Sequence, residues 1–227
     1  MPGIMLNACR VASQPDTLEP APTVEIKFQP DLPAPVLFDT AWADRSIYAP
    51  GLIAAQRSIL DQLPGASVYH IEITLNDDLT SLEGLEEVRY ANRSSTPLDA
   101  IYFRLFPNLF GGVYTTVDRV SVNERTVVPS HELNQSAMRV PLHEPLQPGE
   151  QVVIQIIFSV TFPSIYDTPY GFMGRGEHML ALAYFYPMIA VFDDEGWNIE
   201  TPPEWGEVIY SETSFYQVRV IAPLGQT

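Results

Sequence analysis

Two histidines in the sequence begin the pattern of a zinc-binding helix. In the motif H-E-x-x-H, two imidazoles one helical turn apart hold the metal and the glutamate activates a water molecule. His131 and His143 are each followed by a glutamate, but Gln135 and Gln147 occupy the places of the second histidine. An amide side chain is a poor zinc ligand. We therefore interpret both pairs as surface-loop residues.

The other reactive side chains do not form a catalytic set either. His70 and His178 are expected on different strands, and His70 falls on the polar face of its strand, where a solvated or hydrogen-bonded side chain is expected. The sequence contains no G-x-S-x-G nucleophile motif. The carboxylates at 193–195 lack the alternate spacing of a calcium loop and predict a charged turn. We expect no catalytic residue, no metal ligand and no cofactor in this chain.

The elements that would position these residues are mainly strands. Over residues 68–75 the side chains of Tyr69, Ile71 and Ile73 alternate with polar ones, as in a strand with one buried face. Further strands are predicted at 85–91, 100–106, 117–122, 126–128, 137–142, 152–162 and 215–221. Turn residues separate these runs, and no second helical pattern lies between them. The sequence predicts a mainly β fold, an antiparallel β-sandwich.

One amphipathic helix is predicted before the first strand, over residues 49–63. Pro50 suits a first helical turn, and Pro64-Gly65 provides the stop. The apolar residues of this segment fall on one helical stripe: Leu52, Ile53, Ile59, Leu60 and Leu63.

The first 35 residues are rich in proline, which disfavours a helix and indicates an extended leader before a β-domain over residues 36–227. Residues 6–9 resemble the end of a bacterial lipoprotein signal, so Cys9 is a candidate lipidation site, although no apolar signal core precedes it. A cell-surface or extracytoplasmic location and a cytoplasmic one both stay open. No apolar run approaches the roughly 20 residues that span a bilayer, so no transmembrane segment is expected.

Composition indicates a folded, acidic protein. Apolar residues make up 46% and charged residues 18% of the 227 residues, enough to bury a core. The formal charge of −16 would repel the phosphates of nucleic acid. We therefore exclude nucleic acid as a partner. It would attract a cationic group such as a peptide's free amine, although many soluble proteins are also acidic.

A succession of short motifs runs from Tyr69 to Pro223. In order, the motifs are Y-x-I-x-I-x-L at 69–75, VRYAN at 88–92, IYFRLFPN at 101–108, LQPGE at 146–150, YG at 170–171, YP at 186–187, GW at 196–197, YSE at 210–212 and FYQVRV at 215–220. Their order and spacing resemble the N-terminal domain of the alanyl aminopeptidase family of zinc metallopeptidases, the gluzincins, especially its bacterial members.

The resemblance implies a saddle-shaped β-domain that packs on a thermolysin-like catalytic domain and helps to wall its substrate cleft. The family's G-x-M-E-N motif and zinc helix lie beyond this domain, so we expect a fragment whose intramolecular partner, the catalytic domain, holds the zinc and cuts the peptide substrate. Tyr184 and Tyr186 would line the cleft, although aromatic residues at such spacing are also typical of a core. Many members bind the substrate's amine with Gln or Glu just before this segment, where Leu182 and Ala183 stand here. Aminopeptidase specificity is therefore not implied by these residues.

Two other functions stay open. A free-standing β-sandwich could bind carbohydrate or protein, with Trp197, Trp205 and Tyr184 as stacking platforms. A degenerate family member could serve as a structural scaffold.

Overall fold

The computed structural model describes residues 38–168, 173–201 and 209–225. The predicted proline-rich leader, with Cys9, lies outside these residues, as does Trp205. No helix in the described ranges has both the length and the hydropathy that crossing a membrane requires.

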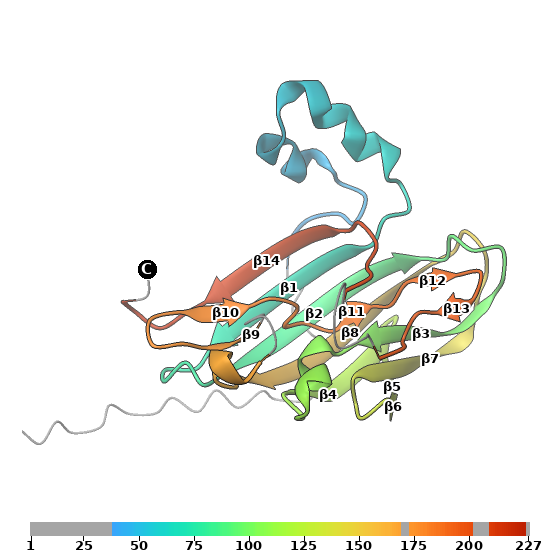
Figure 1. Ribbon diagram of the computed structural model, residues 1–227. Helices are drawn as coiled ribbons and strands as arrows, with labels where there is room; N and C mark the ends of the chain where they lie inside the picture. The colour runs from blue at the N-terminus through green and yellow to red at the C-terminus, as the bar shows by residue number, and fades with distance from the viewer. Residues whose placement is uncertain (1–37, 169–172, 202–208, 226–227) are drawn as a thin grey trace, which may run out of the picture. The chain divides into compact units, whose positions relative to one another are not determined.

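The larger of two main sheets contains six strands in the order β14-β1-β2-β8-β4-β5. Their bounds are Val68–Leu75 for β1, Ser81–Ala91 for β2, Thr115–Val122 for β4, Arg125–Val127 for β5, Gln151–Thr161 for β8 and Phe215–Ile221 for β14. Figure 1 shows β14 at one edge of this sheet, beside β1.

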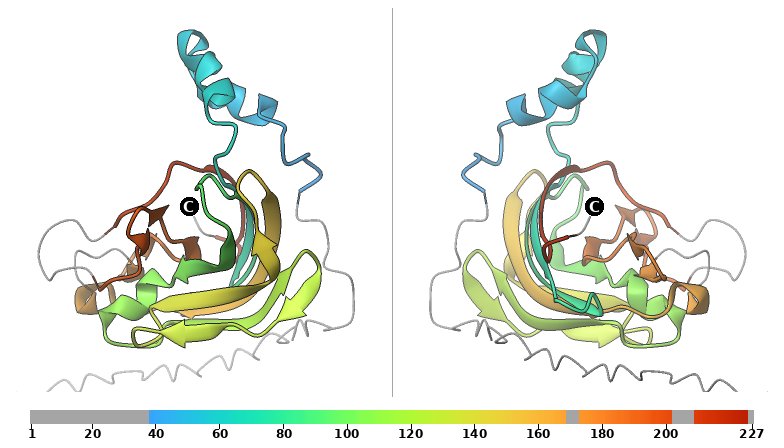
Figure 2. Two further views of the ribbon diagram at one scale, coloured as in Figure 1. Left: turned by 90° about the vertical axis from the view of Figure 1, so that its right-hand side faces the viewer. Right: turned by 90° about the vertical axis from the view of Figure 1, so that its left-hand side faces the viewer.

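The smaller sheet contains four strands in the order β11-β3-β7-β6. Their bounds are Leu98–Arg104 for β3, Ser130–Glu132 for β6, Ala137–Leu146 for β7 and Met188–Ile189 for β11. Two hairpins complete the strands: β9 (Met173–Arg175) with β10 (Leu180–Leu182), and β12 (Phe192–Asp193) with β13 (Gly196–Trp197). Figure 2 shows β3 and the β12–β13 hairpin on the same side of the large sheet.

The core lies between the two main sheets. Alternation is complete along β8, whose buried residues are Val152, Ile154, Ile156, Phe158 and Val160. Phe103 of β3 and Met138 of β7 belong to the same apolar cluster. Gly84 of β2 faces Phe158 so closely that a methyl group there would collide with the ring. The predicted mainly β fold with packed antiparallel sheets is confirmed.

One pairing departs from the antiparallel rule. Among the described strands, β1 and β14 run parallel, with Val68 opposite Phe215 and Thr74 opposite Ile221. The backbone N–H of Phe215 donates to the carbonyl oxygen of Ser67 at 2.9 Å. Parallel strands need a long crossover connection, and here that connection is the rest of the sandwich.

The helical region before β1 forms two 3-10 helices and not one amphipathic α-helix. They are η1 (Ser46–Gly51) and η2 (Ala54–Gln62), and Leu52 and Ile53 between them have extended backbone. Of the predicted apolar stripe only Leu60 is buried, whereas Ile53 is 72% exposed. With three residues per turn in place of 3.6, the 3-10 helix distributes the apolar residues around its axis differently.

Residues 163–212, where the sequence predicts no strand, contain the short strands β9 to β13. These strands have too few residues to show a period of two. The two histidine–glutamate pairs also need correction. His131 lies in β6 and His143 in β7, so these exposed side chains lie on strands and not in loops. The remaining 3-10 helices are η3 (Phe106–Phe110) and η4 (Ile165–Asp167).

Candidate functional site

Three tyrosines from distant parts of the chain form one cluster at the edge of the sandwich. Tyr69 of β1 stacks on Tyr216 of β14 with ring centroids 4.9 Å apart and planes 11° apart. The ring of Tyr186 meets both edge-on, at 5.6 Å from Tyr69 and 5.8 Å from Tyr216. The hydroxyl of Tyr186 donates to that of Tyr216 at 3.0 Å. We call Tyr69, Tyr186 and Tyr216 the tyrosine cluster.

Burial governs the protonation of the cluster. Desolvation raises the pKa of Tyr69 well above the usual tyrosine value, and the pKa of Tyr186 and of Tyr216 is raised mainly for the same reason. The nearby carboxyl of Glu86 acts in the same direction on the pKa of all three hydroxyls. The cluster is therefore neutral at physiological pH and can offer hydrogen bonds but no charge.

Glu86 of β2 is fully buried on the core face of the large sheet, opposite Ile71 of β1 and Ile156 of β8. Within the described residues, neither of its carboxyl oxygens has a hydrogen-bond partner. Burial raises the pKa of Glu86 well above the usual carboxyl range. Next to the tyrosine cluster, the core therefore holds an acid whose protonated form is favoured by burial.

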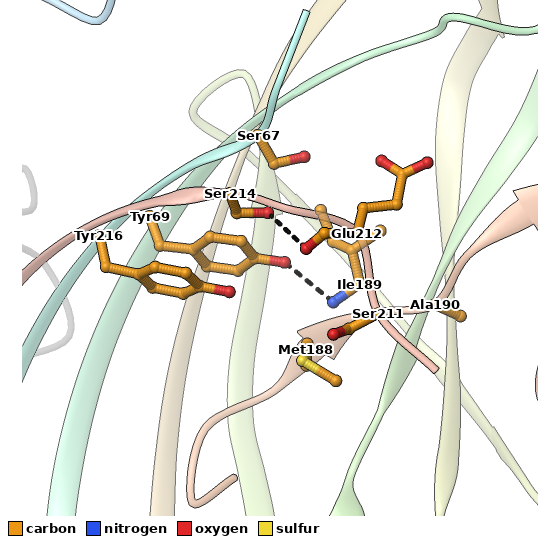
Figure 3. A pocket seen from close by; sticks show the side chains of 9 residues that line it. All are labelled: Ser67, Tyr69, Met188, Ile189, Ala190, Ser211, Glu212, Ser214 and Tyr216. Carbon is orange, nitrogen blue, oxygen red and sulfur yellow. Dashed lines mark hydrogen bonds between the residues drawn. The ribbon is translucent and has the colours of Figure 1, made fainter. Parts of the chain in front are cut away.

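A small cavity of about 10 Å³ adjoins the stacked rings of Tyr69 and Tyr216 (Figure 3). The hydroxyl oxygen of Tyr69 accepts a hydrogen bond from the backbone N–H of Ile189 at 3.1 Å. Met188 and Glu212 also line the cavity. A space of this size is room for about one water molecule, so these residues alone do not enclose a peptide.

Tyr184 is the other residue expected at a substrate cleft. Its ring packs against Phe106 with centroids 5.5 Å apart, and its backbone is left-handed with φ of 55°. A non-glycine residue in this region costs of order 1–3 kcal/mol and persists where the surroundings hold it. Tyr184 and Tyr186 are both half-buried, and their cleft-lining role stays a prediction.

Replacing Tyr186 by phenylalanine should lower the free energy of unfolding by about 0.5–1.5 kcal/mol, because the hydrogen bond to Tyr216 is lost while the ring packing remains. Urea unfolding followed by tryptophan fluorescence measures the change. Tyr166→Phe, at an 86% exposed tyrosine, is the matched control and should leave stability unchanged. Equal free energies of unfolding for the two variants would show that the hydrogen bond between Tyr186 and Tyr216 does not stabilise the fold.

His70 differs from its sequence prediction, because its face of β1 is covered and not solvated. The imidazole is 2% exposed and stacks on Trp42 with ring centroids 4.2 Å apart. Phe38 packs beside it at 5.2 Å. Desolvation, aided by the positive charge of Arg89, lowers the pKa of His70 to about 4. This neutral histidine anchors the segment before β1 on the outer face of the large sheet.

Arg104 of β3 lies under the segment that follows β13. One guanidinium nitrogen donates to the carbonyl oxygen of Glu200 at 3.0 Å, and the group stands 5.2 Å from the ring centroid of Phe106. Desolvation lowers the pKa of Arg104, and the charge of Glu200 opposes that effect. The guanidinium group of arginine remains charged in proteins. Arg104 therefore holds the segment after β13 with a charged hydrogen-bond donor.

A groove of about 350 Å³ lies near η3, lined by residues that include Gly111, Val113, Leu133 and Thr201. Asn108 forms part of its wall. Both amide hydrogens of Asn108 donate, to the carbonyl oxygens of Thr115 at 3.0 Å and of Gln135 at 2.9 Å. Both donor hydrogens of this side chain in the wall of the groove are thus used by hydrogen bonds within the fold.

Metal ligands do not gather anywhere in the part of the chain that the structure describes. Asp193 caps the β12–β13 turn by accepting from the backbone N–H of Glu195 at 3.0 Å and from the amide of Asn198 at 2.9 Å. This confirms the predicted charged turn. His178 is exposed in the turn between β9 and β10, far along the chain from His70.

Trp197 is one of the residues predicted to stack on a bound carbohydrate, and the structure shows its surroundings. Its ring contacts Phe192 at 5.1 Å, Tyr102 at 5.8 Å and Tyr90 at 6.1 Å. The indole therefore packs the β12–β13 hairpin against Tyr102 of the small sheet and Tyr90 of the large sheet.

Comparison with known proteins gives matches among solved structures. No family model matches the sequence, and no curated protein does. An M1 zinc metallopeptidase E323A mutant from Deinococcus radiodurans, bound to a Tyr-Ser-Ala substrate, matches 70% of this chain and 32% of its own at 18% identity and a TM-score of 0.45. The M1 zinc metallopeptidase from Deinococcus radiodurans matches 44% of this chain and 21% of its own at 19% identity and a TM-score of 0.35.

A two-domain M1 zinc metallopeptidase E323A mutant bound to L-tryptophan matches 43% of this chain and 20% of its own, at 20% identity and a TM-score of 0.35. The chain spans about a fifth to a third of the length of the solved chains that it matches.

Sequence reasoning missed Glu86 as a notable residue. A signal was present, because Leu82, Val88 and Tyr90 alternate with the phase of position 86 and are buried. The phase of β2 therefore directs this carboxyl into the core. The grouping of Tyr69 with Tyr216 carried no such signal, since it depends on the parallel pairing of strands at opposite ends of the domain.

Proposed function

We propose that this chain is the non-catalytic N-terminal β-domain of a larger zinc metallopeptidase of the aminopeptidase type, and that it packs on the catalytic domain and walls its substrate cleft. The observation that carries the proposal is the ordered run of motifs from Tyr69 to Pro223.

The placement of these motifs on the fold supports the proposal. The motifs at 69–75, 88–92 and 215–220 fall on β1, β2 and β14, three strands that lie next to one another in the large sheet. The motif at 101–108 continues from β3 into η3. Motifs that belong to one domain are expected to lie together in its fold, as these three do. Motifs that match by chance would have no reason to lie on neighbouring strands.

Zinc does not fit the side chains of this part of the protein. The described residues include no group of three histidine, cysteine or acidic side chains that could hold a metal ion. No step of a zinc-dependent reaction is therefore assigned to this chain, and zinc is proposed for the catalytic domain alone. A peptide would be the substrate of the whole enzyme, and Tyr184 and Tyr186 would face it from the wall of the cleft.

The purified 227-residue chain should contain far less than one zinc per molecule and should not hydrolyse aminoacyl anilides. Metal analysis after dialysis against zinc, together with a hydrolysis assay, measures both. A protein extended to include G-x-M-E-N and zinc-helix sequences, encoded beyond Thr227, should bind zinc and hydrolyse them. Tight stoichiometric zinc in the 227-residue chain would contradict the assignment, as would a coding sequence that continues without either motif.

A free-standing binding module is the alternative function. The exposed aromatic residues Tyr166 and Tyr210 could still supply stacking surfaces, whereas Trp197 is held in packing. Isothermal titration with oligosaccharides separates the two functions, because millimolar or tighter binding by the chain alone would favour the module.

A further inference from the structure

Glu86 lies in the interior of the sandwich, among side chains that water does not reach along three strands. In the pairing of β1 with β2, Ile71 stands opposite Glu86 and Tyr69 stands opposite Val88. Tyr69 is therefore a diagonal neighbour of Glu86 on the same face of the sheet, within reach of a long side chain. Ile71, Val88 and, on β8, Ile156 are fully buried.

The tyrosine cluster is the side of these surroundings that meets water. Tyr69 is 1% exposed, but Tyr216, which stacks on it, is 37% exposed, and Tyr186 is half-buried. Besides burial, the nearby carboxyl of Glu86 raises the pKa of all three hydroxyls. Water therefore reaches this carboxyl most directly past the rings of Tyr186 and Tyr216.

The segment that carries Tyr186 is held by a short strand. It joins β10 to β11 over residues 183–189, and we call it the β10–β11 segment. Strand β11 pairs with β3 through two residues. The hydroxyl of Tyr186 donates to that of Tyr216 at 3.0 Å, and the N–H of Ile189 donates to the hydroxyl oxygen of Tyr69 at 3.1 Å (Figure 3). So short a strand gives up few hydrogen bonds, so it opens at a lower free energy than the long core strands.

Ionisation of Glu86 in its buried position is opposed from every side. The titratable groups that face its carboxyl among the described residues are the three hydroxyls of the tyrosine cluster, which are neutral. Strand β8 presents Ile156, and the core face of the small sheet contributes apolar residues such as Phe103 and Met138. None of these groups carries a positive charge. A carboxylate at this place is therefore stable only when water reaches it.

We propose that loss of the Glu86 proton opens the domain locally: the β10–β11 segment swings away from the stacked rings of Tyr69 and Tyr216, and water hydrates the carboxylate. The two main sheets stay folded. Protonation of Glu86 closes the cluster again. The segment that carries Tyr184 and Tyr186 is thus closed at low pH and opens more often as the pH rises. This inference goes beyond the proposed function and does not rest on it.

The direction of the pH dependence follows from the two forms of Glu86. In the open form the carboxyl meets water and loses its proton near the usual pKa of 4.5, whereas in the closed form burial raises its pKa well above that value. Below about pH 4.5 the closed form keeps its full advantage. Between the two pKa values each pH unit favours the open form by a further factor of about ten, because opening releases one proton.

Native-state hydrogen exchange of the whole 227-residue chain, followed by nuclear magnetic resonance from pH 5 to pH 7, tests this opening. The N–H of Ile189 reports the β10–β11 segment. The reference is the N–H of Thr115 on β4, which donates to the side-chain oxygen of Asn108 at 2.8 Å. The ratio of the two exchange rates removes the common effect of pH on the exchange chemistry. This ratio should rise about tenfold per pH unit in the wild-type chain.

Four variants identify the groups involved. Glu86→Gln removes the proton release and should make the ratio independent of pH. Glu83→Gln, at an exposed carboxylate on the opposite face of β2, should keep the wild-type slope. Tyr186→Phe removes the hydrogen bond to Tyr216 and should raise the ratio about two- to tenfold at every pH without changing its slope. Tyr166→Phe, at an exposed tyrosine, should leave the ratio unchanged.

Three results would overturn the proposal. The first is a ratio that stays constant with pH in the wild-type chain, whether neither amide responds or both respond together through global unfolding. This comparison needs no variant, so it holds even if Glu86→Gln does not fold. The second is a wild-type slope retained by Glu86→Gln. The third is an unchanged ratio in Tyr186→Phe, which would show that the β10–β11 segment does not close the route to the carboxyl.

Discussion

Replacing Glu86 by methionine should raise the free energy of unfolding at neutral pH by about 1–3 kcal/mol. The buried carboxyl has no hydrogen-bond partner among the described residues, and a desolvated polar group without a partner costs about that much. Methionine has similar length, adapts to irregular spaces and brings no polar atom. Urea unfolding at pH 7 measures the gain.

The pH dependence separates this effect from better packing. The carboxyl of Glu86 has its pKa raised by burial, whereas in the unfolded chain it loses its proton near the usual value of 4.5. Its protonated form therefore supports the folded state below about pH 4.5, and this stability is lost as the pH rises towards the raised pKa of the folded protein. The advantage of Glu86→Met should be larger at pH 8 than at pH 5.

Two further variants control the experiment. Glu86→Gln removes the titration but keeps a polar group, so it should flatten the pH dependence and gain less than methionine. Glu83→Gln changes an exposed carboxylate on the opposite face of the same strand and should have little effect. A destabilised Glu86→Met would mean that the carboxyl has a partner and that the buried acid supports the fold.

Replacing Asn108 by alanine should lower the free energy of unfolding by about 3–5 kcal/mol. Besides its two donated hydrogen bonds, the side-chain oxygen accepts from the backbone N–H of Tyr114 and of Thr115, each at 2.8 Å. Alanine would leave buried backbone groups without partners, and each such group costs about 1–3 kcal/mol. Thermal and urea unfolding, followed by far-ultraviolet circular dichroism, measure the loss.

Asn108→Asp refines the result. Aspartate keeps the acceptor but loses both donors and places a charge at a site that is 4% exposed, so it should be at least as destabilising as alanine. Thr201→Ala, at an exposed residue that lines the same groove, should change stability by no more than about 0.5 kcal/mol. If Asn108→Ala were as stable as Thr201→Ala, water would have to replace all four hydrogen bonds.

The strands were predictable from sequence where one face is buried, because the period of two then appears in the residues themselves. This holds for β8, with its five alternating buried residues, and for β1. It fails for β11, β12 and β13, which have two residues each. The period of two is also misleading at His70. The alternation predicts a solvated side chain on the outer face of β1, but β1 is covered on both faces.

The candidate site was predictable only in part. Tyr186 is placed with aromatic partners, but those partners, Tyr69 and Tyr216, come from strands whose pairing leaves no mark in local sequence. The sequence itself shows that neither histidine–glutamate pair completes a zinc-helix motif, because Gln135 and Gln147 stand where the second histidine would be.

The parallel pairing of β1 with β14 has a consequence for how the domain is made. The residues that close this pair, such as Glu72 and Arg219, stand 147 positions apart in the chain. Contacts of such separation form slowly, because a long loop must close before they contribute stability. During synthesis β1 emerges with one edge unpaired and keeps it until nearly the whole domain has left the ribosome. Ribosomes stalled before Phe215 should therefore carry a nascent chain that is open to proteases and chaperones along β1.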